Sequence, residues 1–441
     1  MKAIEYTKKV QIGNEVDVVV VGGGIAGTCS AIAAARTGAS TILIERFAKL
    51  GGNGTSGGVS GFCGESWGQG PVFEDILTDL KKFNAIGPHF YQKDVFMKGR
   101  KYDPEILAIV LQEIALRSGV KLFLHTRFVD AIMGDDKNSI SAIIVSGKSG
   151  MQAIKGKIYI DCTGESDIVH SVGCETAKGR LEDGLQLPMS LMYFIRKVSL
   201  FKKMEKVPED YFDWKPYKGR KDLPMTSFGK AGSNSKSVKI KIPNYDATNT
   251  ESLTGAEIQA RRQMMRVLDY FQRVWRCRWE LDHCSSIIGI REGRRIIGEY
   301  TLKLEDVRNG AQFDDAIAIG CFPLDAHDPG DDKRTYILPK DQLKVPPYHI
   351  PFRCLIPKGM INLLVAGRNL SADQLALSSA RVMTTCGMMG TSAGIGAAIC
   401  IKRNITPLEL FKKDPACIKN EMEDQGAIFD LSFYKKADDD S

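Results

Sequence analysis

A few polar residues have types and spacings that could support catalysis. His349 stands between Tyr348 and Ile350 in a proline-bounded stretch, and a histidine can give or take a proton near neutral pH. Arg294 and Arg295 are adjacent, and a guanidinium can clamp a carboxylate or phosphate through paired hydrogen bonds. We therefore predict His349, Arg295 and Arg294 as catalytic or substrate-binding residues. The alternatives are a structural histidine and arginines that form ion pairs between two parts of the fold.

Two further groups could be reactive. His327 is flanked by Asp325 and Asp328, which is the pattern of an oriented imidazole or of half a metal site. No further ligands stand near it, and the eleven cysteines are scattered without a C-x-x-C pair, so we predict no metal site and no iron–sulfur centre. Cys63 lies in a glycine-flanked loop and could be a redox thiol, although packing is the favoured interpretation.

The elements that would position these groups begin with a strand, a glycine turn, a helix and a second strand, at Val16–Val21, Gly22–Gly27, Thr28–Thr37 and Thr41–Glu45. In a G-x-G-x-x-G turn, Gly22 permits the bend, Gly24 lets a pyrophosphate approach the backbone, and Gly27 lets the helix pack on the strand. Glu45 follows at roughly the 20-residue spacing of the carboxylate that binds a ribose. The pattern predicts a dinucleotide-binding unit.

Three more segments are expected beside this turn. The glycine-rich loop Leu50–Gly58 follows the second strand directly, and Asp161–Glu165 ends another apolar strand in a small-residue turn. The apolar strand Ile361–Ala366 leads into Gly367-Arg368. The small residues of Arg381–Ala398 then predict a closely packed helix. All of these would lie at the carboxyl edge of one parallel sheet, where nucleotides bind in such folds.

The length of 441 residues predicts two or three domains, at about 100–200 residues each. The sequence is loop-rich from about residue 172 to 353 and holds one long helix, whose start is indicated by a capping box of Thr254 and Glu257. We predict an α/β protein with a Rossmann-like nucleotide-binding domain, formed by residues 1–171 and 354–441. An α+β substrate or cap domain, 172–353, is inserted into it.

Composition narrows the class of protein. With 43% hydrophobic and 26% charged residues the chain is globular, and no run of ~18 apolar residues predicts a membrane span. Its polar beginning has no apolar leader, so we expect a cytoplasmic protein. The net charge of +7 is concentrated in Arg196–Lys241, with 13 Lys/Arg against 5 Asp/Glu. A solvated face is the favoured interpretation, and steering of an acidic substrate or binding of nucleic acid are the alternatives.

Together these motifs give the chain a family resemblance. The stretches VVVVGGGIAG, LGGNGTSGG, DCTGESD and NLLVAGRNLSADQLALSSARVMTTCGMMGTSAG resemble FAD-dependent oxidoreductases related to fumarate reductase flavoproteins and to the flavin-binding A subunits of heterodisulfide reductases. The likeness covers most of the chain outside roughly 200–250, and its last block is the most specific. It implies the glutathione reductase type of FAD-binding fold. Heterodisulfide reductase relatives also carry cysteine clusters, which this chain lacks.

The resemblance implies noncovalent FAD as the cofactor, with Glu45 on its ribose and Val129 meeting the adenine through its backbone. A helix starting near Met389-Gly390-Thr391 would reach the flavin. The full set of implied cofactor residues is Gly22, Gly24, Ile25, Ala26, Gly27, Glu45, Arg46, Gly51, Gly52, Asn53, Thr55, Val129, Thr163, Gly164, Gly367, Arg368, Met389, Gly390 and Thr391.

From these residues we expect an FAD-dependent oxidoreductase that transfers a hydride between FAD and a small organic substrate, an anion being one class considered. Two alternatives stay open: a flavin-dependent RNA-modifying enzyme that uses the basic stretch, and a nucleotide-binding scaffold without catalysis. The sequence identifies neither the electron donor or acceptor nor the oligomeric state.

Overall fold

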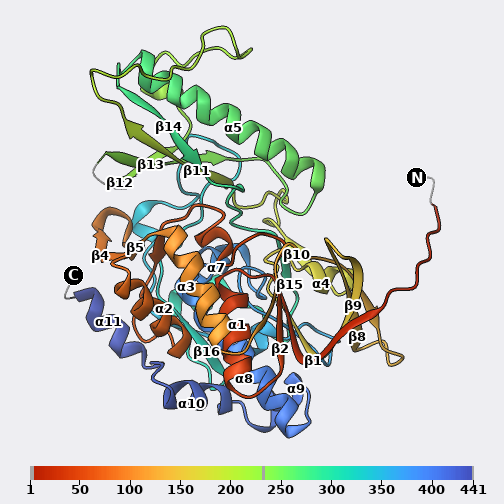
Figure 1. Cartoon of the computed structure of the whole chain (residues 1–441). Coiled ribbons are helices and arrows are strands. Elements are labelled where there is room, and N and C mark those ends of the chain that lie inside the picture. The colour runs from red at the N-terminus through yellow and green to blue at the C-terminus, as the bar shows by residue number, and fades with distance from the viewer. Residues whose placement is uncertain (1–3, 231–233, 440–441) are drawn as a thin grey trace.

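The computed structural model describes residues 4–230 and 234–439, and it has two parts stacked on one another (Figure 1). The larger part is built on a seven-stranded sheet in the order β6-β2-β1-β9-β8-β7, with β18 also paired to β9. Strands β6, β2, β1, β9 and β18 are parallel, and β7 and β8 join antiparallel. The strands are β1 (Ile12–Val21), β2 (Thr41–Ile44), β6 (Lys121–Phe123), β7 (Arg127–Met133), β8 (Ile140–Gly147), β9 (Gly150–Asp161) and β18 (Leu363–Val365).

The predicted strand, turn, helix and strand are present at the centre of this sheet. The apolar run of β1 is fully buried between β2 and β9, as a strand covered on both faces must be. Helix α1 (Ile25–Arg36) begins three residues earlier than the sequence predicts and ends before Gly38, whose φ of 100° suits only glycine without strain. The predicted Rossmann-like α/β class is therefore correct.

Helix α8 (Met383–Arg403) packs along α1 at unusually short distance. A Cβ on Gly390 would lie 2.0 Å from the carbonyl oxygen of Ala26, and one on Gly394 would lie 2.2 Å from that of Ser30. Among the described residues α8 is the one helix long and apolar enough to cross a membrane, and 89% of that apolar window is buried inside the protein. Its apolar composition is thus accounted for by packing in the core, where the small residues let two backbones touch.

The rest of the larger part surrounds this core. Its remaining helices are α2 (Pro71–Lys82), α3 (Pro104–Arg117), α4 (Asp167–Ser171), α6 (Leu304–Asn309), α7 (Gln374–Ala380), α9 (Pro407–Lys413), α10 (Cys417–Asp424) and α11 (Leu431–Asp439). Its small sheets are formed by β3 (Gly61–Cys63), β4 (Ile86–Gln92) and β5 (Met97–Tyr102), by β10 (Thr176–Lys178) and β15 (Arg294–Ile296), and by β16 (Ala316–Gly320) and β17 (Tyr348–Pro351). Short 3-10 helices lie at Gly52–Gly54, Lys93–Val95, Arg220–Asp222, Lys340–Gln342 and Phe352–Leu355.

The smaller part, which we call the cap, lies above the carboxyl edge of the main sheet (Figure 1). Four antiparallel strands run in the order β12-β13-β11-β14, and helix α5 (Thr250–Arg273) covers one face of them. The strands are β11 (Met189–Lys197), β12 (Thr226–Lys230), β13 (Ser235–Ile242) and β14 (Trp279–Cys284). Alternate residues of β13, among them Val238 and Ile240, join the hydrophobic core under α5. The residues between them face the larger part.

Two details of the cap differ from the sequence analysis. Helix α5 begins after Asn249, whose side chain accepts from the Ser252 amide, so Thr254 and Glu257 are not its capping box. Glu257 instead accepts from the backbone of Ile288. The second hydrophobic core spans Met189–Ile290, while β16 and β17 pack in the first core. The domain limits at 171/172 and 353/354 stay predictions, and this packing favours a shorter cap.

Candidate functional site

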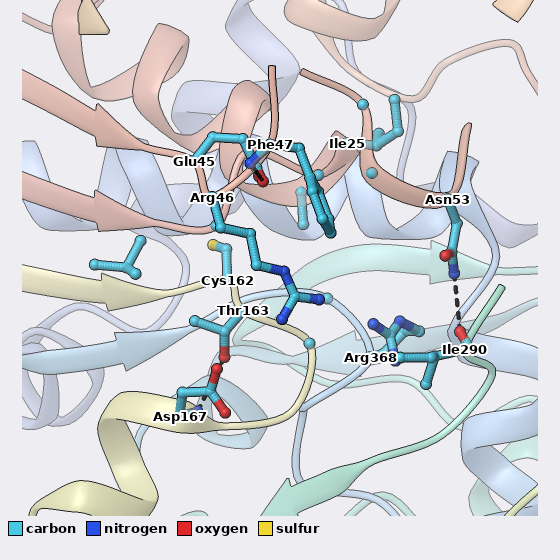
Figure 2. A pocket seen from close by; sticks show the side chains of 18 of the residues that line it. Ile25, Glu45, Arg46, Phe47, Asn53, Cys162, Thr163, Asp167, Ile290 and Arg368 are labelled. Carbon is cyan, nitrogen blue, oxygen red and sulfur yellow. Dashed lines mark hydrogen bonds between the residues drawn. The ribbon is translucent and has the colours of Figure 1, made fainter. Parts of the chain in front are cut away.

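A long pocket of about 1050 Å³, open mouth included, runs along the carboxyl edge of the main sheet (Figure 2). Its lining comes from the glycine turn, the segment after β2, the loop Gly51–Asn53, the turn after β9, the segment after β18 and the start of α8. Ile287, Ile288 and Ile290 of the cap line it from the other side. All the segments that the sequence predicts beside one nucleotide therefore meet in a single pocket.

The glycine turn is built as its spacing requires. Gly22 has a φ of 100°, and a Cβ there would lie 2.3 Å from the carbonyl oxygen of Cys162. A Cβ on Gly27 would lie 1.8 Å from the carbonyl oxygen of Gly22, so only glycine lets α1 meet β1 this closely. Gly24 lines the pocket and has no atom within 4 Å of its Cβ position. Together with the free amides at the start of α1, this opening can receive an anionic group.

Glu45 lines the same pocket and is buried. Its carboxylate accepts from the Gly23 amide at 2.6 Å and from the Phe47 amide at 2.8 Å. Burial raises the pKa of Glu45, while these two amides act to lower it. The side chain thus braces the glycine turn as well as lining the pocket, and it lies where the sequence predicts a ribose.

Two pocket-lining arginines, Arg46 and Arg368, approach the carboxylate of Glu165 (Figure 2). The Arg368 Nη2 atom donates to Glu165 at 2.8 Å, and the Arg46 Nη2 atom lies 4.0 Å from the same carboxylate. The Arg368 Nη1 atom is buried and has no hydrogen-bond partner within the described residues. Arg46, Gly164 and Arg368 all line the pocket, and Thr163 beside them accepts from the Asp167 amide. This wall therefore offers a guanidinium donor to a ligand.

The glycine-rich loop joins the two parts of the molecule. Gly51 and Gly52 have positive φ angles of 104° and 55°, which bring the backbone to the pocket. The Asn53 side chain donates to the carbonyl oxygen of Ile290 in the cap at 2.8 Å (Figure 2). Thr55 does not line the pocket, because its hydroxyl donates inward to the carbonyl oxygen of Leu50 at 2.6 Å.

Four other implied cofactor residues lie differently from expectation. Helix α8 begins at Met383, so Met389, Gly390 and Thr391 lie within it, buried against its neighbours. Met383 and Cys386 from its first turn line the pocket in their place. The side chain of Val129 is 46% exposed, and the pocket is lined by the preceding residues 126–128, so the contact implied for the Val129 backbone stays a prediction. The start at Met383 agrees instead with the helix that the sequence predicts in Arg381–Ala398.

His349, which the sequence predicts as a catalytic residue, does not line this pocket. Its ring is buried in β17 and is not part of the lining. The Phe313 amide donates to Nδ1 at 3.2 Å, and Nε2 lies 2.9 Å from the carbonyl oxygen of Phe429. Burial lowers the pKa of His349, which fits a neutral ring that accepts at one nitrogen and donates at the other. These contacts favour the structural alternative, and a catalytic role for His349 stays a prediction.

The adjacent arginines also hold the fold together. Arg295 is buried, pairs with the buried Glu292 and donates to the carbonyl oxygen of Gly179 at 2.9 Å. Arg294 points the other way and lies 4.0 Å from Asp167. Neither arginine lines the pocket. These contacts favour the ion-pair alternative of the sequence analysis for Arg295, and its catalytic role stays a prediction.

A cluster of buried charged groups that the sequence did not assemble lies where the cap meets the start of α8. Asp325 receives hydrogen bonds from Arg381 at 2.7 Å and lies 2.9 Å from the His327 ring. Burial lowers the pKa of His327 to about 3, so the ring is neutral. Asp328 accepts from neighbouring amides instead, and within residues 4–230 and 234–439 no three His, Cys, Asp or Glu side chains form a metal site.

The cap contributes two cations to the same cluster. Lys239 comes from β13, and Arg291 follows the pocket-lining Ile290. Burial is the main cause that lowers the pKa of Lys239 to about 8, and Arg291 lowers it further. Burial also raises the pKa of the Cys63 thiol to about 11, so a reactive thiolate is not favoured there. We call Cys63, Lys239, Arg291, Asp325, His327 and Arg381 the junction cluster.

The sequence that forms this pocket matches a known protein family. The family model described as FAD dependent oxidoreductase matches residues 17–420, which is nearly the whole chain. The chain belongs to this family. This FAD-dependent oxidoreductase therefore has FAD as its cofactor. The finer relation to fumarate reductase and heterodisulfide reductase flavoproteins stays a prediction.

Individual relatives share part of the sequence or the fold. The chain is 29% identical over 165 residues to digeranylgeranylglycerophospholipid reductase 2 of Methanothermobacter thermautotrophicus, covering 36% of this chain and 42% of that protein. It is 27% identical over 189 residues to thiamine thiazole synthase of Methanococcus vannielii, covering 40% and 64%. These matches span less than two thirds of either relative. The solved structure of CabE, an aromatic hydroxylase from angucycline biosynthesis, shares the fold with a TM-score of 0.51, 14% identity and coverage of 96% and 72%.

The pocket fits the cofactor of this FAD-dependent oxidoreductase. The opening at Gly24 suits a pyrophosphate, and the Arg368 Nη1 atom is a buried donor that still needs an acceptor. Glu45, Arg46, Thr163 and Gly164 line one end, and Gly51–Asn53 and Met383 line the other. These residues would hold FAD along the pocket, and FAD would supply a group that takes up or releases a hydride.

Proposed function

We propose that this FAD-dependent oxidoreductase exchanges a hydride between noncovalently bound FAD and a small organic substrate, which binds between the cap and the start of α8. The observation that carries the proposal is the junction cluster, because it places polar side chains from both parts of the molecule beside the pocket. Arg381 belongs to the cluster and also lines the pocket. A substrate held there would be next to the cofactor and covered by the cap sheet.

The chain's own residues suit this role. The start of α8 lies at this end of the pocket, and a helix N-terminus stabilises negative charge that develops nearby during reduction. The cap residues Ile287, Ile288 and Ile290 provide apolar lining that excludes water. The alternative of an RNA-modifying enzyme loses support, since Lys239 and Lys241 of the basic stretch face inward. A cytoplasmic location remains our expectation.

Two measurements test the proposal. The purified protein should show a flavin spectrum, and the flavin should pass through a filter after denaturation because it is not covalently bound. Small organic acids, amines and alcohols should then be screened for bleaching of that spectrum without oxygen. A substrate that carries deuterium on the oxidised carbon should bleach it more slowly. Product that contains oxygen from O2, with no anaerobic bleaching by any compound, would instead establish a hydroxylase.

A further inference from the structure

The junction cluster has more positive than negative charge. Three cations, Lys239, Arg291 and Arg381, face the single carboxylate of Asp325. The other titratable members carry no charge near neutral pH, because the pKa of His327 is lowered to about 3 and that of Cys63 is raised to about 11. Burial also raises the pKa of nearby Tyr336. Asp325 already accepts from Arg381, which leaves two cap cations without a carboxylate of their own.

The strand register fixes the direction of Lys239. On β13 it pairs across the sheet with Met192 of β11, so both side chains lie on the same face. A Cβ on Gly58 of the larger part would lie 3.0 Å from the Cβ of Met192, which shows that this face is turned toward the pocket loop. Lys239 therefore points away from α5 and into the space between the two parts.

Lys241, two residues further along the same face of β13, is a lysine with a structural role and serves as a comparison for Lys239. Its ammonium donates to the backbone carbonyl oxygens of Asp331 and Arg334, the second at 2.7 Å. In the described part of the chain, the ammonium of Lys239 has no hydrogen-bond or ion-pair partner of this kind. Lys239 is thus half-buried and charged without a role in holding the fold.

Arg291 is held in place but only partly used. It is 9% exposed, and its Nη1 atom donates to the carbonyl oxygen of Pro188 at 2.6 Å and to the hydroxyl of Ser190 at 2.5 Å. Within the described residues, no acceptor is bound to its Nε or Nη2 atoms. Ser190 lies on the same face of the cap sheet as Lys239, so the two cations approach one space. A buried charge is costly unless a counter-charge joins it.

We propose that Lys239 and Arg291 form an oxyanion subsite, which binds a carboxylate or phosphate group of the substrate and so sets its position beside the flavin. The inference rests on the proposed function, because it assigns the substrate class of that same site. The guanidinium would give paired donors and the ammonium a point charge, the combination that suits such a group. Arg381, fixed by Asp325, marks the boundary with the cofactor pocket.

Titration of the FAD-loaded protein tests the subsite. Acetate, succinate and inorganic phosphate would be added at constant ionic strength, with acetamide as the uncharged probe, and the flavin absorption spectrum recorded. We expect saturable changes with the anions and none with acetamide. If only acetate and succinate give a saturable change, the group that binds the subsite is a carboxylate. If only phosphate does, the group is a phosphate. Both results support an oxyanion subsite.

Variants identify the residues. Lys239→Met and Arg291→Gln should weaken anion binding by ~10–100-fold, the range for losing a hydrogen bond to a charged group. Lys239→Arg should keep most of it, and Lys236→Met, on the exposed part of the same strand, should bind as the unaltered protein does. Thermal unfolding gives a second readout. Lys239→Met should unfold at the same or a higher temperature, while Lys241→Met should unfold at a lower one.

Two results would overturn the inference. One is that the FAD-loaded protein shows no saturable response to any of the three anions. The other is that Lys239→Met binds anions normally or unfolds at a lower temperature, which would make Lys239 a structural residue. Either result leaves the proposed hydride exchange standing, because anaerobic bleaching by an uncharged substrate measures that function separately.

Discussion

The two ends of the pocket are formed by different parts of the polypeptide, backbone at one end and side chains at the other. The end at the glycine turn is made of backbone, with Gly22 and Gly27 so close to neighbouring carbonyl oxygens that no side-chain atom fits. The end at the cap has an apolar lining of Ile287, Ile288 and Ile290, and beyond it lie charged side chains contributed by separate segments, of which Arg381 reaches the pocket. The first end holds its shape through contacts within one short stretch of chain. The second exists only when the cap is seated, so its chemistry can differ between relatives that share the first.

The largest expected effect comes from adding one carbon at the backbone end. Gly27→Ala would force α1 away from β1, and we expect a loss of ~3 kcal/mol or more in the free energy of unfolding, with loss of FAD. Gly24→Ala is the matched control, because its Cβ meets nothing in the protein. It should unfold normally without FAD but bind FAD more weakly. If the FAD-free Gly27→Ala and Gly24→Ala variants were equally stable in urea, close backbone contact would not be what holds this end of the pocket.

The next effect concerns the buried ion pair. Arg295→Met would leave Glu292 buried without its partner, at an expected cost of ~3–5 kcal/mol. Arg294→Met, which loses only long contacts, should cost less than ~1 kcal/mol. Urea unfolding measures both. Turnover per folded molecule should be unchanged in Arg295→Met at permissive temperature, and a selective loss of turnover would return Arg295 to the catalytic site.

His349 gives a smaller effect of the same kind. His349→Leu would leave the Phe313 amide and the Phe429 carbonyl without partners, at an expected cost of ~1–3 kcal/mol. The pH dependence of turnover should not change. A variant that is as stable as the unaltered protein yet shows a shifted pH profile would restore the catalytic interpretation.

The pH dependence of anion binding should separate the two ends. Lys239 must be charged to bind an anion, so affinity should fall as pH rises through about 8, by up to ~10-fold per pH unit. Asp325, His327, Arg291 and Cys63 around it do not titrate between pH 6 and 9, and Arg381 also faces it, whereas burial lowers the pKa of Lys241 on the same face to about 8 as well. Lys239→Arg should therefore remove most of the fall, and Lys241→Arg should leave it. Affinity for FAD should stay flat over that range.

The ionisation of Lys239 makes stability rise with pH, whereas it makes the affinity for anions fall. The unfolded chain holds this proton up to the ordinary pKa of 10.5, whereas the folded chain releases it near 8. The unfolded state therefore binds more protons between these values, and this group makes the free energy of unfolding rise with pH across that window. Comparing the unaltered protein with Lys239→Met in urea at pH 7 and pH 9.5 measures the contribution, and a fall with pH would contradict it.

The sequence predicts the end of the pocket at the glycine turn well, because the residues that specify it are contiguous in the chain. The spacing of Gly22, Gly24 and Gly27 and the apolar strand before them specify a local structure, and it is present. Helix α8 begins at Met383, within the segment Arg381–Ala398 that the small residues predict as helical, and not near Met389 as the resemblance implies. Asn249 rather than Thr254 caps α5, since several residues there could accept from the first amides.

The junction cluster could not be predicted from the sequence in the same way. Its members come from five separated segments, and nothing local links Cys63 to Arg381. One signal was present: Val238, Ile240 and Ile242 alternate with Lys239 and Lys241, the pattern of a strand with one apolar and one basic face. Which way the basic face points depends on how the cap is seated, and that is a property of the whole fold.

The close contact between α1 and α8 has a consequence for how the chain folds during synthesis. Ala26 and its partner Gly390 lie near opposite ends of the sequence, and β18, which completes the parallel sheet, is also made late. The glycine turn therefore leaves the ribosome long before its supporting helix is made. Meanwhile the apolar surface of α1 is exposed, and long-range pairing of this kind folds slowly. A nascent chain halted before α8 should depend on chaperones, whereas the cap, whose residues are contiguous, can form on the growing chain.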